Sequence, residues 1–193
     1  MTTPPPVTGS ARRAELLQAA VTYAGAHGLS QLSLRPLAAA VGSSPRVLLY
    51  LFGSKDGLIR AVLDTARAQQ RELVRSALIE DPADLPGLVR RLWTWLAADE
   101  QRDVTRLFFD AFTRSLTDPG DGPWADFART SVKDWQHMLR MAALHAGVDE
   151  QSADALATLY LAVLRGLLLD LHATGDRPRL DAALHVLLAK PDR

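Results

Sequence analysis

Cysteine is absent from this 193-residue chain, which excludes disulfide bonds, thiol nucleophiles and thiolate metal sites. No uninterrupted apolar run approaches the roughly 18 residues that would indicate a membrane-spanning helix. The first residues, MTTPPPVTGS, contain prolines where a secretion signal needs a continuous apolar stretch, so we expect a short disordered arm there. These absences favour a globular protein of the cytoplasm.

Strand patterns are also missing, because no segment alternates apolar and polar residues with a period of two. Helical periodicity is present throughout and predicts an all-α fold of about nine helices. Caps and breakers place these helices at about 11–27, 33–40, 45–52, 55–79, 84–97, 101–116, 122–146, 150–174 and 177–189. We therefore expect a disordered arm at 1–10, a three-helix head at 11–53 and a larger helical body at 54–193.

The charge is zero overall but unevenly distributed. Residues 1–60 contain six Lys or Arg against two Asp or Glu, a net charge of +4, and the remainder has a net charge of −4. A basic N-terminal region on an otherwise acidic chain is typical of a protein that binds phosphates through that region alone.

The segment 41–58, VGSSPRVLLYLFGSKDGL, has the signals of a helix-turn-helix motif. Gly42 allows a sharp turn, Ser44 is a candidate N-cap and Pro45 presets the first helical dihedral. One side of the short helix is expected to dock on the helices behind it through Val47, Leu48, Leu51 and Phe52. The opposite side then presents Arg46 and Tyr50 to the outside.

A helix N-terminus with hydroxyls and an arginine supplies donors for phosphates and for guanine edges in a major groove. Ser33 and Arg35, at the start of the preceding helix, and Lys55, at the start of the following one, are placed to hold backbone phosphates. The predicted DNA-binding residues are Ser33, Arg35, Ser43, Ser44, Pro45, Arg46, Tyr50 and Lys55.

Residues 32–63, LSLRPLAAAVGSSPRVLLYLFGSKDGLIRAVL, resemble the DNA-binding region of the TetR family of bacterial transcriptional repressors. The family pattern L-A-x-x-x-G-x-S-x-x-x-L-Y-x-H-F-x-S-K-x-x-L is matched by Leu37, Ala38, Gly42, Ser44, Leu48, Phe52, Ser54, Lys55 and Leu58. Leu49 stands where tyrosine is usual, and Leu51 where histidine or tyrosine is usual. Those family side chains commonly contact phosphate, so either both contacts are lost or Tyr50 replaces them.

The resemblance also implies a homodimer, because the final two helices of each TetR-family subunit form a four-helix interface. Residues 150–189 are apolar over much of the helical circumference, as a helix buried on two sides would be. The predicted interface residues are Leu156, Leu159, Tyr160, Val163, Leu167, Leu184 and Leu188. The alternative is that these residues form only the core of one chain.

The larger aromatic residues gather in residues 85–145, where they form either ordinary core or the wall of a pocket for a small apolar effector. The predicted effector-binding residues are Phe109, Phe112, Trp124, Trp135 and Met138. Arg106, Arg114, His137 and His145 are candidate polar anchors. His137 and His145 are eight residues apart, too far to share a metal in the usual way, so no metal site is expected.

The resemblance implies a homodimeric repressor that binds a palindromic operator on double-stranded DNA and is released by a small apolar effector. We expect no enzymatic activity and no cofactor, because the sequence lacks nucleophile turns, phosphate-binding glycine loops and Glu-x-x-His pairs. The alternative is a helical-bundle ligand-binding or adaptor protein that does not bind DNA.

Overall fold

The computed structural model describes residues 9–27, 33–80, 84–117, 124 and 126–189, and the regular elements within these ranges are all helical. They are α1 (Gly9–His27), α2 (Leu34–Ala40), α3 (Pro45–Phe52), α4 (Lys55–Glu80), α5 (Leu85–Leu96), the 3-10 turn η1 (Asp99–Gln101), α6 (Arg102–Thr117), α7 (Phe127–His145), α8 (Glu150–Thr174) and α9 (Arg177–Leu188). The predicted all-α fold is confirmed. Most of the expected arm, residues 1–8, lies outside the described residues, and Gly9 and Ser10 already belong to α1.

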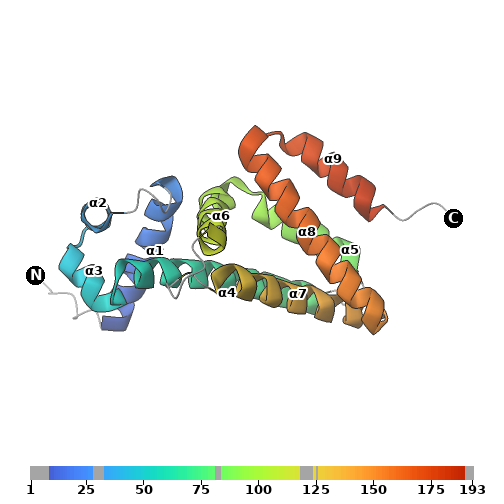
Figure 1. Ribbon diagram of the computed structural model, residues 1–193, viewed down its shortest axis with the longest axis horizontal. Coiled ribbons are helices and arrows are strands. Elements are labelled where there is room, and N and C mark those ends of the chain that lie inside the picture. The colour runs from blue at the N-terminus through green and yellow to red at the C-terminus, as the bar shows by residue number, and fades with distance from the viewer. Residues whose placement is uncertain (1–8, 28–32, 81–83, 118–123, 125, 190–193) are drawn as a thin grey trace, which may run out of the picture.

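The helices form an elongated molecule with α1, α2 and α3 at one end (Figure 1). The long helix α4 leaves this head and runs along the molecule toward the body, where α8 and α9 lie at the opposite end. The helix-turn-helix segment is therefore at one extremity of the chain, with its outer surface turned away from the body.

Helix ends are set by residues whose caps are visible in the sequence. Asp149 begins α8 by accepting a hydrogen bond from the Ser152 N–H at 3.0 Å, and Asp84 accepts one from the Gly87 N–H at 2.8 Å at the start of α5. Gly175 ends α8 with a left-handed φ of 68°, a conformation that glycine adopts without steric cost. The boundaries predicted from caps and glycines differ from the observed ones by a few residues at most where both are described.

The core of the head continues into the body. Leu16, Leu37 and Leu48 pack with residues from the first turns of α4, and the same cluster includes Leu107 and Ala111 of α6. The head is thus anchored to α6 as well as to the start of α4. Helix α6 makes these contacts mainly with α1 and α4.

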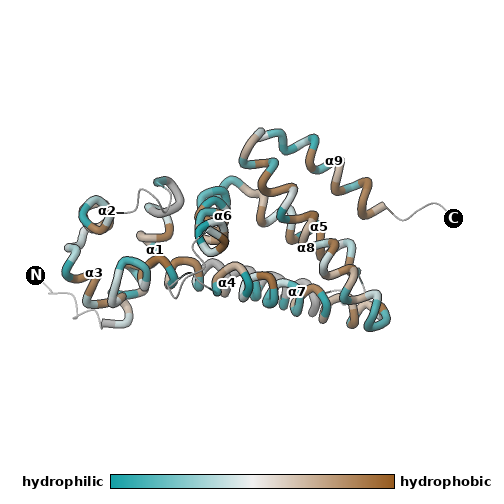
Figure 2. Tube along the Cα trace, in the orientation of Figure 1, coloured by the Kyte–Doolittle hydropathy of each residue, from teal (hydrophilic) through white to brown (hydrophobic). Residues whose placement is uncertain are grey.

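A second core cluster fills the body and joins α5, α7, α8 and α9. Figure 2 shows how apolar residues recur along α8 and α9. Helix α8 is long and apolar enough to cross a membrane by length and composition alone. One of its faces is used in the protein core, where Ala157, Leu161 and Leu164 are buried.

The side of α3 that docks on the head is narrower than the sequence predicted. Leu48 and Phe52 are buried and Leu51 is half-buried against the same core, but Val47 remains 39% exposed. Val47 follows Arg46 around the helix toward the outer surface, so the prediction that it docks inward is wrong. Only residues one full turn apart, Leu48 and Phe52, face directly into the cluster.

Leu48→Ala should lower the free energy of unfolding by about 2–5 kcal/mol, because it removes a buried side chain and leaves a cavity. Val47→Ala is the matched control on the same helix and should change it by less than about 1 kcal/mol. Urea unfolding followed by circular dichroism measures both. Equal losses in the two variants would contradict the observed orientation of α3.

Candidate nucleic-acid interface and effector cavity

The turn between α2 and α3 is fixed by backbone geometry at Gly42. Its φ of 62° lies in the left-handed region, and the Ser43 N–H donates to the Ala38 carbonyl at 2.8 Å. These features close α2 and redirect the chain within a few residues. They position α3 against the head with its N-terminus toward solvent.

Two serines begin the helices of this motif, and they use their hydroxyls differently. Ser44 Oγ accepts a hydrogen bond from the Val47 N–H at 3.2 Å, so the predicted cap of α3 is confirmed. Ser33 occupies the N-cap position of α2, but its side chain makes no capping hydrogen bond. The exposed Ser33 hydroxyl therefore does not cap α2.

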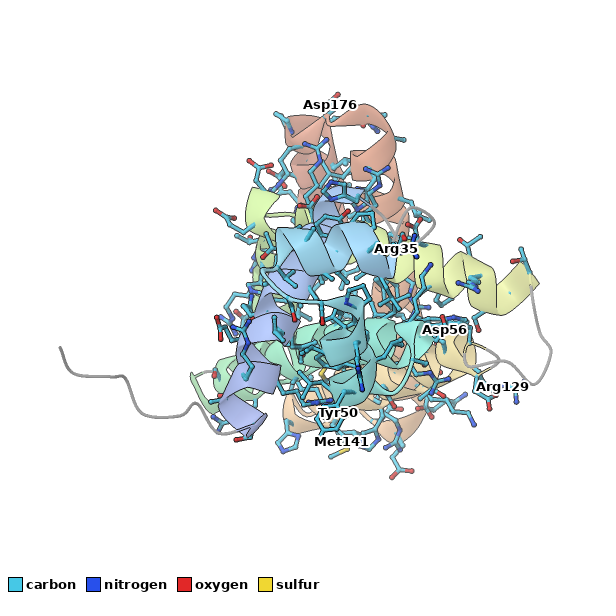
Figure 3. All side chains as sticks on the ribbon, turned by 90° about the vertical axis from the view of Figure 1, so that its left-hand side faces the viewer. Arg35, Tyr50, Asp56, Arg129, Met141 and Asp176 are labelled. Carbon is cyan, nitrogen blue, oxygen red and sulfur yellow. The ribbon has the colours of Figure 1, made fainter. Side chains whose placement is uncertain are left out.

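The outer surface of the head carries the predicted polar side chains. Tyr50 is 87% exposed, and Arg46 and Arg35 are also exposed. Figure 3 views this end of the molecule, with Arg35 on α2 above Tyr50 on α3. The remaining predicted residues border them: Ser33 and Ser44 are exposed, and Ser43, Pro45 and Lys55 are half-buried.

Two other arginines of the basic segment have an internal role that the sequence did not reveal. Arg12 donates to the Gly42 carbonyl at 3.2 Å, and Arg13 donates to the Leu51 carbonyl at 3.4 Å. The Arg13 guanidinium also lies 4.9 Å from the centre of the Phe52 ring. Helix α1 thus braces both ends of the turn–helix segment, and part of the basic charge serves the head itself.

The two departures from the TetR-family pattern occupy different environments. Leu51 is half-buried and packs against the head core, whereas Leu49 is 41% exposed. An apolar residue at position 51 therefore adds to the packing of α3. Tyr50 is the aromatic hydroxyl that this helix presents to solvent.

The residues predicted to form a dimer interface do not share one surface. On α8, Leu159 is 44% exposed, and Leu156, Tyr160, Val163 and Leu167 are half-buried against the body core. On α9, Leu184 and Leu188 are buried within the same chain. With Leu180 they form a stripe at four-residue spacing that packs on the body, so their assignment to an intermolecular surface is wrong.

The structure instead exposes a different stripe on α8, of which only Leu159 was predicted from the sequence. Its members are Ala155, Leu159, Ala162, Gly166 and Leu169. Their spacing alternates between four and three residues, the pattern of a helix–helix seam. A Cβ built on Gly166 would meet no atom within 4 Å, so a second helix could approach closely there. The heptad interval of Ala155, Ala162 and Leu169 was the available sequence signal.

An apolar cavity of about 30 Å³ lies in the body between α6, α7 and α8. It is lined by Leu96, Thr105, Phe108, Phe109, Trp135, Leu161, Leu164, Arg165 and Leu168. Of the predicted effector residues, Phe109 and Trp135 therefore reach the cavity. Phe112 stacks on Arg165, whose guanidinium carbon lies 4.9 Å from its ring centre.

The other two predicted effector residues lie elsewhere. Trp124 is buried in the cluster that joins the head to α6, and Met138 packs against the body core. Among the candidate anchors, His145 hydrogen-bonds the Met141 carbonyl of its own helix at 2.7 Å, and His137 is exposed. Neither histidine lines the cavity.

Arg165 is the charged residue that lines the cavity, and it was not among the effector-binding residues predicted from the sequence. Its Nη2 atom is buried and has no hydrogen-bond partner in the described part of the chain. Burial lowers the pKa of the Arg165 guanidinium. The signal in the sequence was a lone arginine within the apolar run LAVLRGLLLDL.

A more polar hollow of about 310 Å³ adjoins the cavity and shares Leu96 and Thr105 with it. His172 lines this hollow and is hydrogen-bonded to Thr105 at 2.9 Å. Its pKa is lowered by burial and then by the nearby Arg102 and Arg106. The acidic residues near the start of α6 form no group suited to a metal ion, and no such group occurs among the described residues.

Comparisons with known proteins agree with this arrangement. The family model described as bacterial regulatory proteins, tetR family, matches residues 16–62, which cover α2, α3 and the adjoining parts of α1 and α4. No curated protein sequence matches the chain.

Solved structures extend the similarity beyond the head. A TetR-family member from Streptomyces coelicolor A3 is 25% identical, with a TM-score of 0.65 over 93% of this chain and 99% of that chain. The multidrug binding protein EbrR, complexed with imidazole, is 26% identical, with a TM-score of 0.62 over 94% of this chain and 92% of that one. A putative transcriptional regulator from Saccharomonospora viridis in complex with choline is 20% identical, with a TM-score of 0.73 over 93% and 96% of the two chains.

The head matches a family model, and the similarity to solved structures covers both the head and the helical body. Residues 16–62 match the tetR family of bacterial regulatory proteins, and the chain has the fold of solved TetR-family transcriptional regulators.

Proposed function

We propose that this protein is a homodimeric transcriptional repressor that binds a palindromic operator and is released from it by a small effector. The observation that carries the proposal is the outer surface of the head, where Arg46 and Tyr50 stand exposed on a helix braced from behind. A short helix so presented fits a major groove, and arginine can bind phosphate or a guanine edge. Arg35 and Ser33 on α2, with Lys55 on α4, would hold the flanking backbone.

Dimerisation is supported by the exposed apolar stripe on α8. Soluble proteins seldom leave a row of apolar and small residues uncovered along a whole helix. A second copy related by a twofold axis would cover it with the same residues, as in an isologous interface. The two heads would then meet half-sites about one helical turn apart on a duplex.

Release by an effector is supported by the position of α6, which contacts both the cavity and the core of the head. Thr105 and Phe109 on one side of α6 line the cavity, whereas Leu107 and Ala111 on its other side belong to the head core. A ligand that enlarges the cavity would displace α6 and with it the head. Such a ligand shifts the equilibrium only by its preference for the displaced arrangement. Two proteins similar in structure, a putative transcriptional regulator from Saccharomonospora viridis and the multidrug binding protein EbrR, have been solved with choline and proflavin bound, which supports a ligand-responsive body.

Selection of binding sequences from a pool of random duplexes tests this function. We expect enrichment of inverted repeats, and an affinity for them that falls steeply with salt because phosphate contacts release counterions. If no sequence is enriched and retention does not depend on salt, the protein is an adaptor and the proposal fails. A template carrying the selected site before a reporter gene separates repression from activation.

A further inference from the structure

The apolar cavity in the body contains one charged side chain. Most of its wall is apolar, with Phe109, Trp135 and Leu161 prominent, but Arg165 enters it from α8. An arginine cannot release its proton under physiological conditions. The cavity therefore carries a fixed positive charge in an apolar wall.

That charge lacks a full set of partners within the protein. The Arg165 guanidinium lies near the Phe112 and Phe108 rings, at 4.9 and 5.9 Å from their centres, and these contacts use the faces of the rings. Its buried Nη2 has no hydrogen-bond acceptor among the described residues, and burial lowers its pKa. A buried donor without an acceptor is costly, so a ligand that supplies an anionic oxygen gains more here than at the surface.

We propose that the effector is an amphipathic carboxylate, with its apolar body among Phe109, Trp135 and Leu161 and its carboxylate on Arg165. This inference rests on the proposed release by an effector and names the chemical class of that effector. A quaternary ammonium such as the choline bound by the Saccharomonospora viridis regulator would meet a like charge here.

Access for such a ligand is suggested by the hollow that adjoins the cavity. The cavity volume of about 30 Å³ is far below the ~300–1,000 Å³ typical of ligand sites, so binding requires the walls to part. Thr105 lines both spaces, and its hydrogen bond to His172 lies beside their common boundary. Breaking this bond is the step that we expect to join the cavity to the larger hollow.

Calorimetric titration of the free protein with three probes that share an eight-carbon chain tests the proposal. The probes are octanoate, octanol and octyltrimethylammonium, each below its micelle concentration. We expect octanoate to bind at least about tenfold more tightly than the alcohol, and the ammonium more weakly than both. An ammonium preference, or no octanoate binding, would overturn the assignment.

Arg165→Met keeps an unbranched apolar stem and should abolish the preference for octanoate while leaving octanol binding intact. Arg165→Lys should retain part of it, and Arg165→Gln provides a second neutral variant if the methionine variant does not fold. Arg106→Met removes an exposed cation of a neighbouring polar hollow and should keep the preference. If Arg106→Met loses the preference and Arg165→Met keeps it, the anion binds outside the cavity and the inference is wrong.

Measuring operator binding in the presence of each probe distinguishes a failure of the carboxylate assignment from a failure of the proposed repressor function. Octanoate that binds through Arg165 without weakening operator binding would leave the ligand assignment intact and refute release by an effector. Release of the operator by the ammonium probe in preference to octanoate would support the repressor and overturn the carboxylate.

Discussion

Ala162→Arg is expected to separate the proposed dimer into monomers and to lower operator affinity about a hundredfold or more, because the second half-site then no longer binds intramolecularly. Ala162 lies at the middle of the exposed stripe on α8, one turn from Gly166. In a twofold interface the substitution would place two arginines opposite each other in an apolar seam. Like charges buried together, without partners, oppose association strongly.

Sedimentation equilibrium measures the effect of this substitution, and fluorescence anisotropy with the selected operator measures its consequence. Ala14→Arg introduces the same side chain at an exposed alanine of α1 and should leave the protein dimeric. Circular dichroism should show that both variants remain helical. A dimeric Ala162→Arg protein would exclude the α8 stripe from the interface.

Arg46→Ala should weaken operator binding by about 1–3 kcal/mol, roughly five- to 150-fold, without changing the oligomeric state. Arg46 is exposed at the beginning of α3, one residue after the Pro45 that starts the helix. If it contacts a base edge, the loss should fall on one position of the half-site and specificity there should relax. If it holds a phosphate, the loss should be uniform and the salt slope should become shallower by about one.

Anisotropy titrations over a series of salt concentrations and operator variants distinguish these outcomes. Arg90→Ala is a suitable control, because Arg90 is an exposed arginine of α5, outside the head. It should bind the operator as the unmodified protein does. An Arg46→Ala protein with undiminished affinity would remove Arg46 from the interface.

The sequence predicted the fold of the head well, because its determinants are local. Gly42, Ser44 and Pro45 act within one turn of the chain, and their effects on the backbone do not depend on distant contacts. The TetR-family pattern combines these same positions with the buried Leu48 and Phe52. The position of Val47 was misjudged because a helix of eight residues has too few turns for periodicity to define its buried side sharply.

The body could not be predicted to the same depth. Helices α8 and α9 are apolar on several sides, and periodicity alone does not say which stripe meets its own chain. Leu184 and Leu188 therefore looked equivalent to residues that are in fact exposed. Arg165 was missed for a related reason: its surroundings come from α6, which lies more than 45 residues away in the sequence.

A footprint of the protein on a selected operator tests most directly whether the exposed side of α3 reads a duplex. We expect two protected half-sites on the same face of the DNA, with centres about one helical turn (10–10.5 base pairs) or a multiple of it apart. Arg46→Ala should reduce protection symmetrically in both. Protection that is absent, confined to one half-site in the dimer, or unchanged when α3 is altered at Arg46 and Tyr50 together would contradict it.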